Sequence, residues 1–163
     1  MKPIMKIELK NIKYAAFASQ ETSCYAATIY IDGQKVGTVE NNGHGGCDII
    51  RPHAVEQRIN EWVAPETAET IFGKLLLAWL QERDLKRLLA RRILFTRNHR
   101  VLQTNSFSSS IELKKRLGEV GLLAKLNAEE ILNLLPFPRA LVLYLGFLRG
   151  PKETQIKTHE VKP

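Results

Sequence analysis

The fold class follows from residues 24–40, which read CYAATIYIDGQKVGTVE. In the first half of this segment every second residue is apolar, which is the period of a β-strand with one buried face. These inward positions are Tyr25, Ala27, Ile29 and Ile31. Asp32-Gly33 provides the positive φ that a tight hairpin turn requires. Residues 35–40 are therefore predicted to return as the antiparallel partner strand.

The neighbouring elements are predicted from hydrophobic spacing. Residues 6–18 alternate in part and predict one strand or two short ones. Helical spacing predicts helices over residues 53–63 and, after a proline, over about 67–92. A second hairpin is predicted over residues 93–103, because Asn98 tolerates the left-handed conformation of a turn between two apolar runs.

The last third of the chain is predicted to be mainly helical. Residues 111–123 have helical spacing that is interrupted by two glycines. Asn127 and Glu130 form a plausible capping pair for a helix over residues 128–135. A Pro-Phe-Pro break then separates this helix from a final apolar helix over residues 139–148.

Length and composition set the class of protein. The chain has 163 residues, of which 44% are hydrophobic and 25% charged, as in ordinary soluble proteins. We expect one α+β domain over residues 1–149, an antiparallel sheet built from hairpins with several helices packed on one face, and a mobile C-terminal tail over 150–163. Residues 131–147 are too short, and carry two prolines and an arginine, so no membrane span is expected. Two cysteines favour a reducing, cytoplasmic setting.

Positive charge is concentrated in the middle third. Residues 83–100 contain seven Lys/Arg against one acid, Asp84, so their excess of +6 nearly matches the +7 of the whole chain. Arginines four residues apart stack along one helix face, so helix and hairpin are predicted to form one positive surface suited to phosphate contacts. The residues assigned to this surface are Arg83, Lys86, Arg87, Arg91, Arg92, Arg97, His99 and Arg100. The alternative is an ordinary solvated helix face.

A second candidate is the glycine-rich segment NNGHGGCD at residues 41–48. Three glycines and two asparagines cannot continue a regular strand, so a loop is predicted. The segment matches neither the P-loop nor the dinucleotide-binding glycine pattern. It is either a wide connection or a contact for a ligand or partner. The loop residues assigned to that contact are Asn42, Gly43, His44, Gly45, Gly46 and Cys47.

Metal binding and thiol catalysis are further hypotheses. His44, Cys47 and His53 have an irregular His-x2-Cys-x5-His spacing, to which Cys24 would add a fourth zinc ligand. Cys47 with a histidine and Asp48 has the residue types of a thiol enzyme, but no family signature surrounds the cysteine. No catalytic motif is present, so we expect a non-enzymatic protein without a cofactor.

Three segments carry a resemblance to a known group of proteins. They are residues 27–40, the GHGGC sequence at residues 43–47 and the ILNLLPF sequence at residues 131–137. Together they resemble small uncharacterised accessory proteins carried by phages and other mobile genetic elements. The resemblance implies a non-enzymatic role in modulating host machinery, such as inhibition of host defence, and it assigns no functional residue.

The leading expectation is a small binding protein whose basic helix–hairpin surface contacts nucleic acid, or an acidic protein partner such as a nucleic-acid-handling host complex. One alternative is a protein–protein inhibitor that acts through the glycine-rich loop. Another is a metal-binding enzyme that uses His44, Cys47 and His53.

Overall fold

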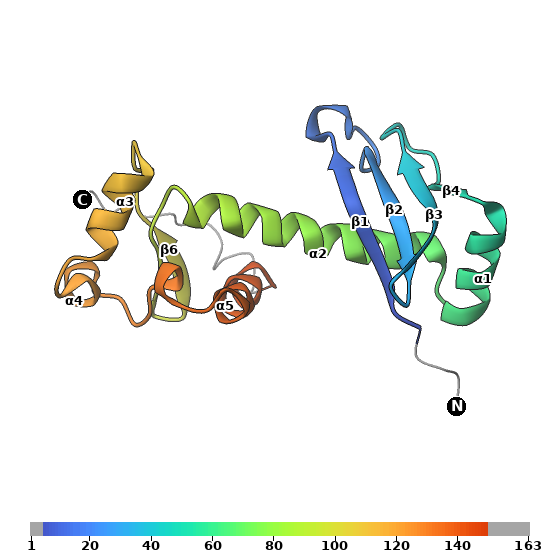
Figure 1. Ribbon diagram of the computed structural model, residues 1–163. Helices are drawn as coiled ribbons and strands as arrows, with labels where there is room; N and C mark the ends of the chain where they lie inside the picture. Colours follow the sequence, from blue (N-terminus) through green and yellow to red (C-terminus); the bar gives the residue numbers. More distant parts are fainter. Residues whose placement is uncertain (1–4, 150–163) are drawn as a thin grey trace. The chain divides into compact units, whose positions relative to one another are not determined.

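The structure is a computed structural model that describes residues 5–149 (Figure 1). Its contacts divide the chain into two compact units, an N-terminal unit up to Trp79 and a C-terminal unit from Leu80 onward. The described elements are β1 (Ile7–Tyr14), η1 (Ala16–Ala18), β2 (Tyr25–Ile31), β3 (Gln34–Asn41), β4 (Ile49–Arg51), α1 (His53–Val63), α2 (Ala68–Leu89), β5 (Leu94–Arg97), β6 (Arg100–Gln103), α3 (Ser110–Leu117), α4 (Leu122–Leu126), η2 (Leu132–Leu134) and α5 (Phe137–Arg149). The predicted α+β class is confirmed. The predicted tail over residues 150–163 lies outside the described residues, and the single domain stays a prediction.

The N-terminal unit contains a four-stranded antiparallel sheet in the order β1-β2-β3-β4. The predicted hairpin of β2 and β3 is confirmed, with Asp32 at φ 50° and Gly33 at φ 81° in its turn. Along β2 buried and half-buried residues alternate strictly, as the apolar spacing predicted. One face of the sheet is therefore buried.

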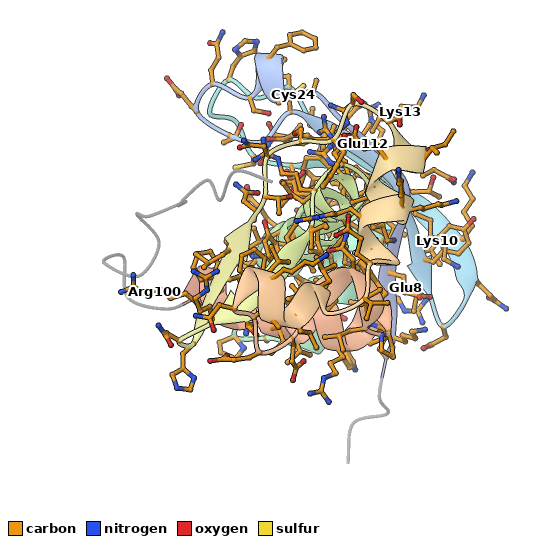
Figure 2. All side chains as sticks on the ribbon, turned by 90° about the vertical axis from the view of Figure 1, so that its left-hand side faces the viewer. Glu8, Lys10, Lys13, Cys24, Arg100 and Glu112 are labelled. Carbon is orange, nitrogen blue, oxygen red and sulfur yellow. The ribbon has the colours of Figure 1, made fainter. Side chains whose placement is uncertain are left out.

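The core of this unit combines that face with two helices. Its buried apolar side chains are Tyr25, Ala27, Ile29, Ile31, Val39 and Ile50 from the sheet, and Ile59, Ala68, Phe72 and Leu76 from α1 and α2. The other face of β1 is polar, and Figure 2 shows Glu8, Lys10 and Lys13 following one another along this strand. Thr67 caps α2, because its Oγ1 accepts the N–H of Thr70 at 3.2 Å.

In the C-terminal unit a two-stranded hairpin lies between two apolar clusters. The turn of the β5–β6 hairpin places Asn98 at φ 50° and His99 at φ 58°, which confirms the predicted turn. Successive residues of a strand point to opposite faces. Phe95 accordingly joins a cluster with Leu113 of α3 and Leu122 of α4. Leu94 joins a second cluster, whose buried members also include Leu85, Leu132 and Ala140.

The predicted helix over residues 128–135 is wrong. Asn127 adopts φ 47° and ends α4 instead of starting a new helix. The chain then pairs with β5, where the N–H of Thr96 donates to the carbonyl oxygen of Glu130 at 2.9 Å and the N–H of Glu130 donates to Thr96 Oγ1 at 3.1 Å. Backbone N–H and carbonyl groups that a helix would need are thus hydrogen-bonded to β5. A single 3-10 turn, η2, follows. The predicted helices over residues 53–63 and 67–92 are confirmed as α1 and α2, although α2 ends at Leu89. Residues 111–123 form parts of two separate helices, α3 and α4, and α5 begins two residues early.

Asn133 joins three segments of the C-terminal unit through its side-chain amide. Its Oδ1 accepts the N–H of Leu94 at 2.8 Å. Its Nδ2 donates to the carbonyl oxygens of Leu89 at 3.0 Å and Arg92 at 2.9 Å. The end of α2, the start of β5 and η2 therefore depend on one amide, which also satisfies carbonyls that the end of a helix leaves without partners.

Replacing Asn133 with leucine is expected to lower the free energy of unfolding by about 2 kcal/mol, because three partners lose their hydrogen bonds at once. Urea denaturation of the full chain followed by circular dichroism measures the change. Leu134→Ala is the matched control, since Leu134 is 59% exposed in the same turn, and it should cost less than about 1 kcal/mol. Equal effects of the two changes would contradict the role given to the amide.

Candidate anion-binding site

Arginines at the end of α2 line a surface pocket of about 430 Å³ in the C-terminal unit, called the arginine pocket below. Its lining residues are Asp84, Arg87, Leu88, Arg91, Arg92, Ser106 and Tyr144. Arg87 lies in the last turn of α2 and Arg91 two residues beyond its end, and both line this pocket.

Local backbone bonds hold the pocket in place. The carbonyl oxygen of Leu88 accepts the N–H groups of Arg91 at 3.0 Å and Arg92 at 2.8 Å, which continues the turn beyond α2. The N–H of Phe107 donates to the carbonyl oxygen of Arg91 at 2.8 Å, which brings the preceding Ser106 to the arginines. Tyr144 belongs to α5, and together with Leu88 it packs against the second apolar cluster.

Positive charge dominates the pocket. Arg87 and Arg91 are both exposed, and across residues 5–149 no carboxylate forms an ion pair with either of them. Arg92 is half-buried and donates through one guanidinium nitrogen to the carbonyl oxygen of Thr104 at 3.4 Å. Asp84, the acid in the lining, pairs with Arg83 at 3.4 Å. Two guanidinium groups are therefore exposed, and no carboxylate among residues 5–149 compensates their charge.

Tyr144 adds a neutral hydroxyl to this lining. Burial, and to a lesser extent the nearby Asp84 carboxylate, raises the pKa of the Tyr144 hydroxyl above its ordinary value. A tyrosine hydroxyl is protonated at neutral pH even at its ordinary pKa, so Tyr144 can donate a hydrogen bond to an anion.

Two more of the predicted basic residues, Arg97 and Lys86, have partners within the protein. Arg97 donates from Nε to the carbonyl oxygen of Asn127 at 3.0 Å and from Nη2 to the carbonyl oxygen of Leu126. It thereby satisfies the carbonyls that α4 leaves free at its C-terminus. Lys86 lies 3.8 Å from a carboxylate oxygen of Glu82 and 5.0 Å from the centre of the Phe137 ring.

The hairpin tip belongs to a different pocket. His99 and Arg100 are exposed and line a pocket of about 540 Å³ together with Glu129 and Glu130. Glu130 is paired with Arg139 at 2.6 Å. The structure therefore brings Arg87, Arg91 and Arg92 together in the arginine pocket, while the hairpin residues face mixed charge.

The glycine-rich loop is fastened by a side chain that sequence reasoning missed. Asn41 is buried, and its Nδ2 donates to the carbonyl oxygen of Gly46 at 2.9 Å and to a carboxylate oxygen of Asp48 at 3.1 Å. Its Oδ1 accepts the Gly43 N–H at 2.9 Å and the Thr22 hydroxyl at 2.8 Å. An alternating strand that ends in asparagine is the signal that could have indicated an inward amide.

Tyr25 holds the far end of the loop. Its hydroxyl donates to Asp48 at 2.5 Å, and burial, followed by this carboxylate, raises the pKa of Tyr25 far above its ordinary range. Gly43 is buried, whereas the other residues assigned to the loop contact are exposed. Those exposed residues are Asn42, His44, Gly45, Gly46 and Cys47. The part of the loop that was predicted to contact a ligand or partner is therefore exposed to solvent.

The three residues considered for a metal are not assembled into a ligand set. Within residues 5–149 no group of three or more His, Cys, Asp or Glu side chains is placed to hold a metal ion. His44 instead lies 3.3 Å from Oε1 of Gln20, and His53 pairs with Glu56 at 2.9 Å. Cys47 is a free, exposed thiol, so the structure gives no support to a site built from His44, Cys47 and His53.

Comparison of the chain with protein-family models, curated proteins and solved structures finds no match. In the part of the chain that the structure describes, no helix combines the length and apolar composition needed to cross a membrane. Function is therefore inferred from the geometry of the sites.

Proposed function

We propose that this protein is a small non-enzymatic binding protein whose arginine pocket takes a phosphate group of nucleic acid. The observation that carries the proposal is the pair of exposed guanidinium groups, Arg87 and Arg91, which no described carboxylate neutralises. A guanidinium presents N–H groups in a fixed fork that matches two oxygens of a phosphate, and such charge-assisted bonds are about twice as strong as neutral ones.

The pocket favours a bound anion in other ways. Asp84 would repel a phosphate, but Arg83 holds that carboxylate in an ion pair. The hydroxyls of Ser106 and Tyr144 offer further donors. Each of these groups binds and orients an anion, and the proposal assigns none of them a covalent step.

The proposal includes a cellular setting. Two free thiols suit a reducing cytoplasm, and the resemblance to accessory proteins of mobile elements would make a host nucleic-acid-handling complex the place of action. An acidic protein surface would meet the same guanidinium groups. Digestion of the nucleic acid with nuclease separates these cases, because only a protein partner remains bound afterwards.

Binding is expected to weaken steeply with salt. Neutralising two to three phosphate charges on duplex DNA predicts a loss of affinity of roughly 10- to 40-fold between about 50 and 200 mM NaCl, because released counterions oppose binding at higher salt. Fluorescence anisotropy with labelled duplex DNA, single-stranded DNA and RNA measures the slope. Binding that salt leaves unchanged, or no binding to any of the three, would contradict the proposal.

A second candidate is an inhibitor that contacts a protein through the glycine-rich loop. Phe17 of η1 is 92% exposed beside this loop, where the N–H groups of Gln20 and Glu21 both donate to the carbonyl oxygen of Gly43 at 3.0 Å. A large aromatic side chain held on a fastened turn is suited to anchoring a protein interface. A single stoichiometric partner that survives nuclease treatment would favour this candidate.

A further inference from the structure

Resting on the proposed function, we infer that the arginine pocket recognises the terminal phosphate monoester of a nucleic-acid strand in preference to phosphodiesters along its backbone. The distinction concerns the charge, the shape and the hydrogen-bond donors of the pocket.

Charge favours the monoester. Arg87, Arg91 and Arg92 bring three guanidinium groups to one pocket, and the single carboxylate in the lining, Asp84, is paired with Arg83. A phosphate monoester carries about −1.5 to −2 at pH 7 and has three strong acceptor oxygens. An internal phosphodiester carries one charge and has two such oxygens, so it leaves more of this positive charge uncompensated.

Shape favours the end of a strand. The volume of about 430 Å³ lies within the range of small-ligand pockets. A terminal phosphate can enter a pocket with one sugar behind it, whereas an internal phosphate must bring a sugar on each side. Leu88 and Tyr144, which both pack on the same apolar cluster, supply an apolar wall for that one sugar.

Two hydroxyl groups complete the set of donors. Ser106 is exposed and Tyr144 half-buried, and across residues 5–149 neither hydroxyl donates to an acceptor of the protein. A tyrosine hydroxyl is protonated at neutral pH, so Tyr144 can donate to an anion. With the arginines, the hydroxyls provide donors for a third phosphate oxygen, which an internal phosphodiester does not offer.

The test compares single strands of one sequence that carry a 5′-phosphate, a 3′-phosphate or hydroxyls at both ends. With the full wild-type chain, one phosphorylated form is expected to bind about tenfold more tightly than the hydroxyl form, because charge-assisted bonds to the monoester are lost with it. The two phosphorylated arms tell which end is read. Arg91→Gln should abolish the preference. Tyr144→Phe, which keeps the ring in the apolar cluster, should reduce it about two- to tenfold.

The control is Lys114→Gln, because Lys114 is exposed on α3 outside the pocket and the change removes the same charge as Arg91→Gln. It should leave the preference intact. Measurable but equal binding of all three strands would overturn this inference and leave the proposed function standing. Failure of all three strands to bind would overturn this inference, and failure of duplex DNA, single-stranded DNA and RNA alike would overturn the proposed function as well.

Discussion

Replacing Gly43 with alanine is expected to lower the free energy of unfolding by about 3 kcal/mol or more. Gly43 has φ 86°, a conformation that costs an L-residue about 1–2 kcal/mol. A Cβ atom at this position would overlap the carbonyl oxygen of Ala18 and lie 2.9 Å from Cβ of Cys24. Steric overlap with backbone cannot be relieved by rotating a side chain, so the loop itself would have to move.

Movement of the loop would break a set of hydrogen bonds. The carbonyl oxygen of Gly43 accepts N–H groups from Gln20 at 3.0 Å, Glu21 at 3.0 Å and Thr22 at 3.3 Å. Its own N–H donates to Asn41 Oδ1 at 2.9 Å. Each lost bond costs about 0.5–1.5 kcal/mol, and more where a buried group is left without a partner. Gly43→Ala is therefore destabilising in either case. If the loop keeps its conformation, the added Cβ overlaps backbone atoms, and if the loop moves, these hydrogen bonds are lost.

Gly46 provides the matched control in the same loop. A Cβ atom built there meets no heavy atom within 4 Å, and its φ is not in the left-handed region. Gly46→Ala is therefore expected to change stability by less than about 0.5 kcal/mol. Urea denaturation of both variants of the full chain measures the difference. A Gly43→Ala protein as stable as the Gly46→Ala protein would show that the loop is not fastened as described.

The sequence was most informative where a local pattern and tertiary burial agree. Along β2 the apolar spacing and the turn at Asp32-Gly33 both require the same hairpin, so this hairpin could be predicted without knowing its surroundings. At residues 128–135 the two requirements conflict. Asn127 and Glu130 suit a helix start, but the bonds between Thr96 and Glu130 use the backbone for strand pairing instead.

The candidate site shows the same limit. The sequence showed that positive charge gathers near the end of α2, but it cannot distinguish Arg91 from Arg97. Arg97 turns inward because the C-terminus of α4, 30 residues later, presents carbonyl groups to it. Arg91 stays exposed, and within residues 5–149 no carbonyl or carboxylate oxygen pairs with its guanidinium group. No sequence pattern marks Ser106 or Tyr144 as a site residue, since only the folding of the C-terminal unit brings them to the arginines.

Reversing the charge of Arg87 and Arg91 together is expected to weaken nucleic-acid binding by at least about 100-fold at low salt. Two charge-assisted contacts are lost, each worth about 1.5–3 kcal/mol, and two carboxylates then repel the phosphate. The salt slope should also become shallower by about 2, since each phosphate contact contributes about 1. Both side chains are exposed, so the Arg87→Glu, Arg91→Glu protein is expected to stay folded.

The control must separate a local site from the general attraction of a basic protein with a net charge of +7. Lys114→Glu with Lys115→Glu changes the net charge by the same amount, and both lysines are exposed on α3 outside the arginine pocket. This control should weaken binding only about threefold, because long-range attraction between exposed charges is screened by salt. If both double variants lost affinity equally, binding would depend on net charge alone and the arginine pocket would have no special role. A loss confined to the Arg87 and Arg91 variant would locate the phosphate at the end of α2.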